Sequence, residues 1–118
     1  MKAARKKRAA DQVQRARQAY KASVARLADA GDALTVAGER WTAKRSERTH
    51  VELVTACCTV LGQIDDTIEV LDEYLHAGKG LLSKSRVETL RYSRAELELR
   101  RANTRVQLAK VTKMDRGN

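Results

Sequence analysis

Two Glu-x-x-His pairs on the chain have a spacing that could bind metal ions. Glu47 with His50 and Glu73 with His76 match the spacing that supplies ligands in di-metal four-helix bundles. Both pairs fall on one predicted helix, about 39 Å apart at helical rise, so only an antiparallel dimer would bring them together. We therefore expect the histidines to cap or flank the helix ends, and we predict no metal site and no cofactor.

An acidic cluster in the middle of the chain has carboxylates three and four residues apart, so they share one helical face. Such a face could hold a hard cation, but pairing with basic side chains on neighbouring helices is the simpler role. The cluster consists of Asp65, Asp66, Glu69, Asp72 and Glu73. Its expected partners are Lys21 and Arg26 before it in the chain and Arg91 and Arg94 after it.

The remaining reactive residues do not form a catalytic set. Cys57 and Cys58 are adjacent, point about 100° apart on a helix, and are expected to be two small buried residues in a reducing compartment. Gly78-Lys79-Gly80 lacks the spacer, the following Ser or Thr and the preceding strand of a phosphate-binding loop. With no nucleophile–base pair either, we predict that the protein is not an enzyme and has no small-molecule substrate.

Positive charge is abundant and unevenly distributed. The chain contains 24 Lys and Arg against 15 Asp and Glu, a net charge of +9. The net charge is +8 over residues 1–46, −6 over 47–77 and +7 over 78–118. Three such segments attract one another when they fold side by side, so part of the basic excess is expected to be neutralised internally.

The elements that must position these residues are helices. The 118-residue chain has no proline and few aromatic residues, which favours long uninterrupted helices in one domain. Between Val51 and Leu75 apolar residues alternate at intervals of three and four, the pattern of a helix buried against other helices. This seam is Val54, Cys57, Leu61, Ile64, Ile68, Leu71 and Leu75.

A heptad from Val13 to Trp41 predicts one long first helix that ends near Ser46, with Gly31 and Gly38 allowing close backbone approach. A break at Gly31, which would make four helices, is the alternative.

Thr49 with Glu52 and Ser85 with Glu88 predict capping boxes, and Ala77–Gly80 predicts a turn. The second helix then ends near His76, and the third covers about Arg86 to Val111. The short connections predict an all-α fold, either an antiparallel three-helix bundle or an elongated helical hairpin with a third helix along it.

Basic residues are expected to gather at one end of this fold. Residues 1–12 form a basic N-terminal arm, helical or frayed, that overhangs at the end of the second turn. Lys and Arg bind nucleic acid by neutralising phosphates, and the chain has no sequence-reading motif or aromatic stacking platform. The predicted nucleic-acid-binding residues are Lys2, Arg5, Lys6, Lys7, Arg8, Arg15, Lys79, Lys84 and Arg86.

The expected function is therefore that of a self-associating helical protein that binds nucleic acid without strong sequence preference. The alternative is a structural or scaffold subunit of a larger assembly, such as a phage or plasmid-encoded particle component. In that case the third helix and the Gly31/Gly38 face would pack on other chains. No signal-peptide pattern or membrane span is recognisable, so we expect a cytoplasmic protein without membrane contact.

Overall fold

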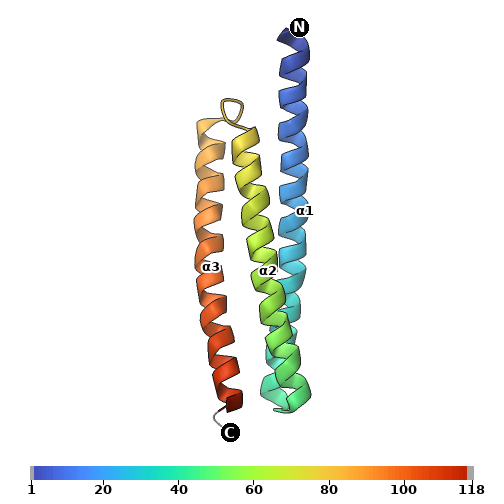
Figure 1. Cartoon of the computed structure of the whole chain (residues 1–118), viewed down its shortest axis with the longest axis vertical. Helices are drawn as coiled ribbons and strands as arrows, with labels where there is room; N and C mark the ends of the chain where they lie inside the picture. Colours follow the sequence, from blue (N-terminus) through green and yellow to red (C-terminus); the bar gives the residue numbers. More distant parts are fainter. Residues whose placement is uncertain (1, 117–118) are drawn as a thin grey trace.

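The computed structural model describes residues 2–116, with side chains described for residues 2–113. It contains three helices: α1 (Lys2–Ala43), α2 (Glu47–Ala77) and α3 (Lys84–Arg116). Consecutive helices are antiparallel and α2 lies between the other two in Figure 1, forming a rod of 68 × 19 × 18 Å. The predicted all-α three-helix fold is confirmed. The alternative break at Gly31 is wrong, because α1 continues through this residue.

The α1–α2 connection is a tight turn stabilised by a capping box. Ser46 is the N-cap of α2: its Oγ accepts a hydrogen bond from the Thr49 backbone N–H at 3.2 Å. In return, the Ser46 backbone N–H donates to Thr49 Oγ1 at 3.0 Å. The predicted box of Thr49 with Glu52 is therefore wrong by one turn, because Thr49 occupies the third position of the helix instead of its cap.

The α2–α3 connection contains the predicted glycine turn. The Gly78 backbone N–H donates to Tyr74 O at 2.9 Å, and Gly80 has a φ of +78°, which favours glycine. Ser83 then caps the start of α3, since its Oγ accepts a hydrogen bond from the Arg86 backbone N–H at 3.1 Å. The predicted cap at Ser85 is wrong because α3 begins two residues earlier, at Lys84.

Three apolar clusters follow one another along the rod. Near the α1–α2 turn, one cluster contains buried residues from all three helices: Ala37 of α1, Leu53 and Cys57 of α2, and Val111 of α3. The middle cluster is Leu27, Ala30, Val60, Ile64 and Ile68. Near the α2–α3 turn, Leu71, Tyr74 and Leu90 are buried, with partly buried Val13, Ala16, Tyr20, Leu75, Leu82 and Leu97 packed against them.

Helix α2 is buried along two lines rather than one, because it packs against both neighbours. The predicted seam accounts for part of this burial: Cys57, Ile64, Ile68 and Leu71 are buried, whereas Val54, Leu61 and Leu75 are half-buried. A second heptad, comprising Leu53, Val60, Thr67 and Tyr74, is buried as well. Leu53 and Val60 widen the apolar stripe in the sequence, whereas Thr67 is polar and does not stand out in an apolar pattern.

The interface between α1 and α2 contains a closed ring of buried hydrogen bonds. Ser23 and Thr67 are both fully buried, and their hydroxyl oxygens are 2.7 Å apart. Gln63 Nε2 donates to Ser23 Oγ at 3.0 Å, and Thr67 Oγ1 donates to Gln63 O at 2.8 Å. Because each hydroxyl has one hydrogen, the Ser23 hydroxyl must donate to Thr67 Oγ1.

Candidate nucleic-acid interface

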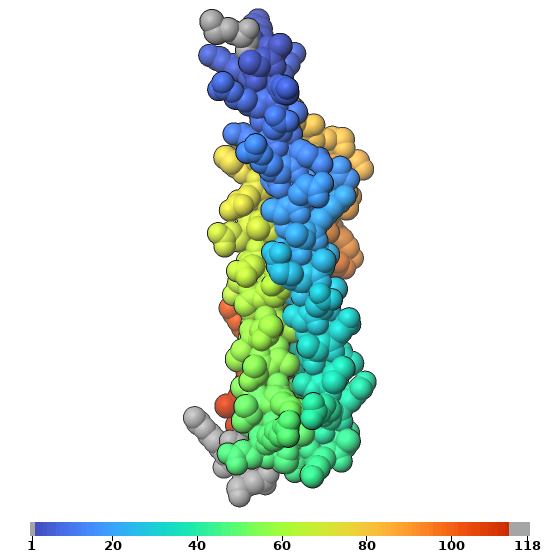
Figure 2. Space-filling view, turned by 90° about the vertical axis from the view of Figure 1, so that its right-hand side faces the viewer, coloured from blue at the N-terminus to red at the C-terminus, as the bar shows by residue number. Residues whose placement is uncertain are grey.

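The N-terminal arm is a continuation of α1 beyond the rest of the bundle. Figure 1 shows the first turns of α1 projecting past the α2–α3 loop, and Figure 2 shows them as a single column without neighbouring chain segments. Val13 and Ala16 are the first residues to pack on the apolar cluster near that loop. Residues 2–12 are therefore a helix in which every residue except half-buried Ala9 is exposed, which agrees with the helical form of the expected arm.

The cations of the arm surround the helix. Successive residues are rotated by about 100°, so Lys2, Arg5, Lys6, Lys7 and Arg8 point to all sides. All five are exposed, as is Arg15, and none forms an ion pair within the described part of the chain.

The first turn of α1 contains no acidic residue to offset the partial positive charge of a helix N-terminus. The helix end and the side chains thus favour the same kind of partner, an anion.

The loop cations lie at the same end of the rod but on different elements. Lys79 belongs to the α2–α3 loop, while Lys84 and Arg86 are in the first turn of α3, and all three are exposed. Arm and loop cations therefore share one end of the molecule, although the arm extends farther (Figure 1). The nine predicted side chains form a basic surface, hereafter the basic end, around a protruding helix. They do not enclose a pocket.

A second basic group lies at the opposite end of the rod, where α1 joins α2 and α3 ends. Its members Lys44, Arg45, Arg48, Lys110 and Lys113 are exposed. Arg45 lies over the ring of Trp41, with its guanidinium carbon 5.2 Å from the ring centroid. We call this group the distal basic group.

The acidic cluster pairs mainly with α3, and its pairs differ in part from the predicted ones. Arg94 Nε donates to Asp72 at 2.7 Å, as expected for Arg94, and Arg101 donates to Asp65 at 2.9 Å. The hydrogen bonds to Asp72 and then to Glu98 raise the pKa of Arg94 above its ordinary value. In the described residues, Lys21, Arg26 and Arg91 form no ion pair with the cluster.

No backbone of a neighbouring helix packs closely against Gly31 or Gly38 of α1. A Cβ at Gly31 would lie 2.6 Å from a guanidinium nitrogen of Arg100, so a side chain of α3 occupies this space. A Cβ at Gly38 would meet no atom within 4 Å. The predicted close backbone approach is therefore wrong, because α1 and α3 meet only through side chains.

The histidines and cysteines act as structural or surface groups. The ring of His50 stands edge-on to Trp41, and its Nε2 lies 3.1 Å from Val111 O, which ties α2 to the end of α3. Among the described residues, no three His, Cys, Asp or Glu side chains are grouped as metal ligands. Burial, and then the neighbouring Cys58, raise the pKa of Cys57. Cys58 is exposed, so the expectation that both cysteines are buried is wrong for it.

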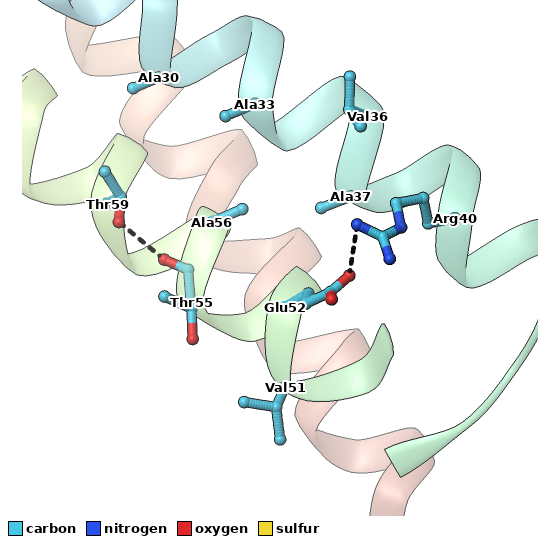
Figure 3. Close-up of a pocket in the computed structure, with 10 residues that line it drawn as sticks. All are labelled: Ala30, Ala33, Val36, Ala37, Arg40, Val51, Glu52, Thr55, Ala56 and Thr59. Atoms are coloured by element: carbon cyan, nitrogen blue, oxygen red, sulfur yellow. Dashed lines mark hydrogen bonds and ion pairs between the residues drawn. The ribbon is translucent and has the colours of Figure 1, made fainter. Parts of the chain in front are cut away.

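An open groove lies between α1 and α2 near their connecting turn (Figure 3). It has a volume of about 550 Å³ and is lined mainly by small and β-branched side chains. Its charged members, Arg40 and Glu52, form an ion pair at 3.4 Å. The groove lies near the α1–α2 turn (Figure 3), away from the basic end. Its lining residues are Ala30, Ala33, Val36, Ala37, Arg40, Val51, Glu52, Thr55, Ala56 and Thr59.

Comparison of the chain with protein-family models, with curated proteins and with solved structures gave no match. Within the described residues, none of the helices has a stretch that is both long enough and apolar enough to cross a membrane.

Proposed function

We propose that the protein binds nucleic acid through its basic end, without strong sequence preference, and that it associates with itself. The observation that carries this proposal is the exposed α1 arm, which has five cations around one helix, only one acidic residue (Asp11), and no ion pair among the described residues. Phosphate backbones supply the missing negative charge, and such contacts are largely independent of base sequence. Within residues 2–113 no acid forms an ion pair with an arm cation, and the cross-helix ion pairs occur along the body of the rod.

The direct test is binding of a fluorescent 20-base-pair DNA duplex in 100 mM salt, followed by anisotropy. A variant with Gln in place of the five arm cations keeps a good helix former at each position. We expect it to bind at least about tenfold more weakly. If about five phosphates are contacted, the slope of log K against log salt concentration should be about 4.5 smaller in magnitude than for the natural chain.

The matched control replaces the distal basic group with Gln. It removes the same number of positive charges, five, from the other end of the rod. If binding depends on the arm, the control retains most of the affinity. Undetectable binding by the natural chain would refute the proposal, and equal losses in both variants would show that net charge, rather than the basic end, determines affinity.

The second candidate function is that of a structural subunit in a larger assembly. It is favoured by large apolar side chains that remain exposed on α3. Light scattering before and after nuclease treatment separates the two candidates. A particle that is free of nucleic acid and keeps its size over a wide concentration range favours the structural role. A high 260/280 nm absorbance ratio that is lost with nuclease favours nucleic-acid binding.

A further inference from the structure

The outer face of α3 has a regular apolar line that no other part of the described chain covers. Tyr92, Leu99 and Val106 follow one another at seven-residue intervals and are 67%, 63% and 54% exposed. Three residues after each of them comes an exposed alanine, at 95, 102 and 109. Spacing of three and four is that of the a and d positions of a coiled coil. We call these six residues the α3 outer seam.

The outer seam is distinct from the line by which α3 joins the bundle. Leu90, Leu97, Thr104 and Val111 form the inner line, also at seven-residue intervals, and each is buried or half-buried. The outer line begins two residues later, which rotates it by about 200° around the helix. Helix α3 therefore presents two apolar lines on opposite sides, and within the described residues only the inner one packs against another helix.

We propose that the outer seam is the surface through which two copies of this chain form an antiparallel dimer. The inference rests on the self-association in the proposed function and names its surface and orientation. Antiparallel packing centred between Leu99 and Ala102 pairs every large residue with an alanine. Leu99 faces Ala102 of the partner subunit, Tyr92 faces Ala109 of the partner subunit, and Val106 faces Ala95 of the partner subunit. Each layer of the dimer interface then contains one large residue and one alanine, so the layers have similar thickness.

A parallel pair has the opposite property. It places each large residue against its own copy and each alanine against alanine, so wide and narrow layers alternate along the seam. Two straight helices cannot close over both kinds of layer without leaving voids, and voids lower stability. Size complementarity thus favours the antiparallel arrangement.

Charges beside the seam favour the same orientation. In the antiparallel pair, Glu98 lies opposite Arg105 of the partner subunit, and symmetry repeats this ion pair. In the parallel pair, Arg91 would lie beside Glu96 of the partner subunit, but Arg105 would lie beside Lys110 of the partner subunit, so attraction and repulsion offset each other. Glu98 and Arg105 are both exposed; Glu98 also pairs with Arg94 of its own chain, and Arg105 has no ion pair among the described residues.

The antiparallel dimer has a defined distribution of basic surfaces. Each end of the dimer presents the basic end of one copy and the distal basic group of the other. Such a particle would contact a nucleic-acid segment at each of its two ends.

The test is sedimentation equilibrium of the full chain without nucleic acid, from about 5 to 500 µM, because a short helical seam gives a weak interface. We expect a monomer–dimer equilibrium for the natural chain. Val106→Asp and Leu99→Asp should weaken it at least about 100-fold, because symmetry places two unpaired carboxylates in one apolar seam. Both positions are exposed in the monomer, so circular dichroism should show unchanged helix content.

Val51→Asp is the matched control. Val51 is 56% exposed, close to the 54% of Val106, and it lies in the groove between α1 and α2. The dimer constant should change less than about threefold. A natural chain that stays monomeric at the highest concentration would overturn the proposal. So would a dimer that Val51→Asp dissociates and Val106→Asp does not.

Charge reversal tests the orientation. Arg105→Glu alone should weaken an antiparallel dimer, because it faces Glu98 of the partner subunit, but it should strengthen a parallel one through Lys110 of the partner subunit. Adding Glu98→Arg to Arg105→Glu should restore the antiparallel dimer to within about threefold of the natural chain. Strengthening by Arg105→Glu alone, or failure of the double variant to recover, overturns the antiparallel arrangement. Since these samples contain no nucleic acid, failure here leaves DNA binding by the basic end standing, and the reverse also holds.

Discussion

The hydrogen-bonded ring of Ser23, Gln63 and Thr67 leads to the prediction that a second substitution stabilises a variant that the first substitution has destabilised. The chain of donors runs from Gln63 Nε2 to Ser23 Oγ, from Ser23 to Thr67, and from Thr67 to Gln63 O. Thr67→Val preserves shape but leaves the fully buried Ser23 hydroxyl without an acceptor. An unsatisfied buried donor costs about 1–3 kcal/mol, so we expect Thr67→Val to lower the free energy of unfolding by about 2 kcal/mol.

Ser23→Ala should be milder. Thr67 still donates to Gln63 O, and half-buried Gln63 can hydrogen-bond to water instead, so the expected loss is about 1 kcal/mol. In the double variant no hydroxyl is left unsatisfied, because both hydroxyls have been removed. The two new apolar side chains then contact each other between α1 and α2. We expect the double variant to lose only about 1 kcal/mol. Adding Ser23→Ala to Thr67→Val should therefore raise the free energy of unfolding by about 1 kcal/mol.

The measurement is a double-mutant cycle by urea denaturation monitored by circular dichroism, with thermal midpoints as a check. For a chain of this length 1 kcal/mol corresponds to a shift of about 3–6 °C. All four proteins are to be compared at one concentration, so that self-association contributes equally. Additive losses in the double variant, or a larger loss from Ser23→Ala than from Thr67→Val, would refute the assigned direction of the hydrogen bonds.

Two further predictions follow from the caps and the cysteines. Ser46→Ala should lower the free energy of unfolding by about 1 kcal/mol in the same assay, whereas Ser46→Asp should retain most of the stability because its carboxylate also caps a helix. Loss of equal size in both variants would contradict the capping role. Iodoacetamide at pH 8 should modify exposed Cys58 much faster than Cys57, whose burial raises its pKa and lowers its thiolate fraction. Peptide mass spectrometry distinguishes the two sites, and equal modification of both would contradict the burial of Cys57.

Several features of the molecule follow from the order of residues alone. Absence of proline, the apolar seam of α2 and the glycines at Gly78 and Gly80 predict three helices and the position of the second turn. The seven-residue repeat favours a first helix that continues through Gly31, and the structure confirms this over the alternative break. The protruding arm follows from helix lengths, because α1 ends and α2 begins at the same turn and α1 is the longer of the two. Periodicity and length are properties of single elements, so one sequence suffices to read them.

Contacts between elements required the tertiary structure. The rotation of each helix about its own axis decides which of its faces meets a neighbour, and the sequence of one helix does not specify this rotation. For this reason the partners of Asp65, the space filled by Arg100 at Gly31, the burial of Thr67 and the exposure of Cys58 were not predicted correctly or at all. The outer seam of α3 emerged for the same reason. Its residues are apolar in the sequence, but only the packed bundle shows that they stay exposed and that no described residue of the chain covers them.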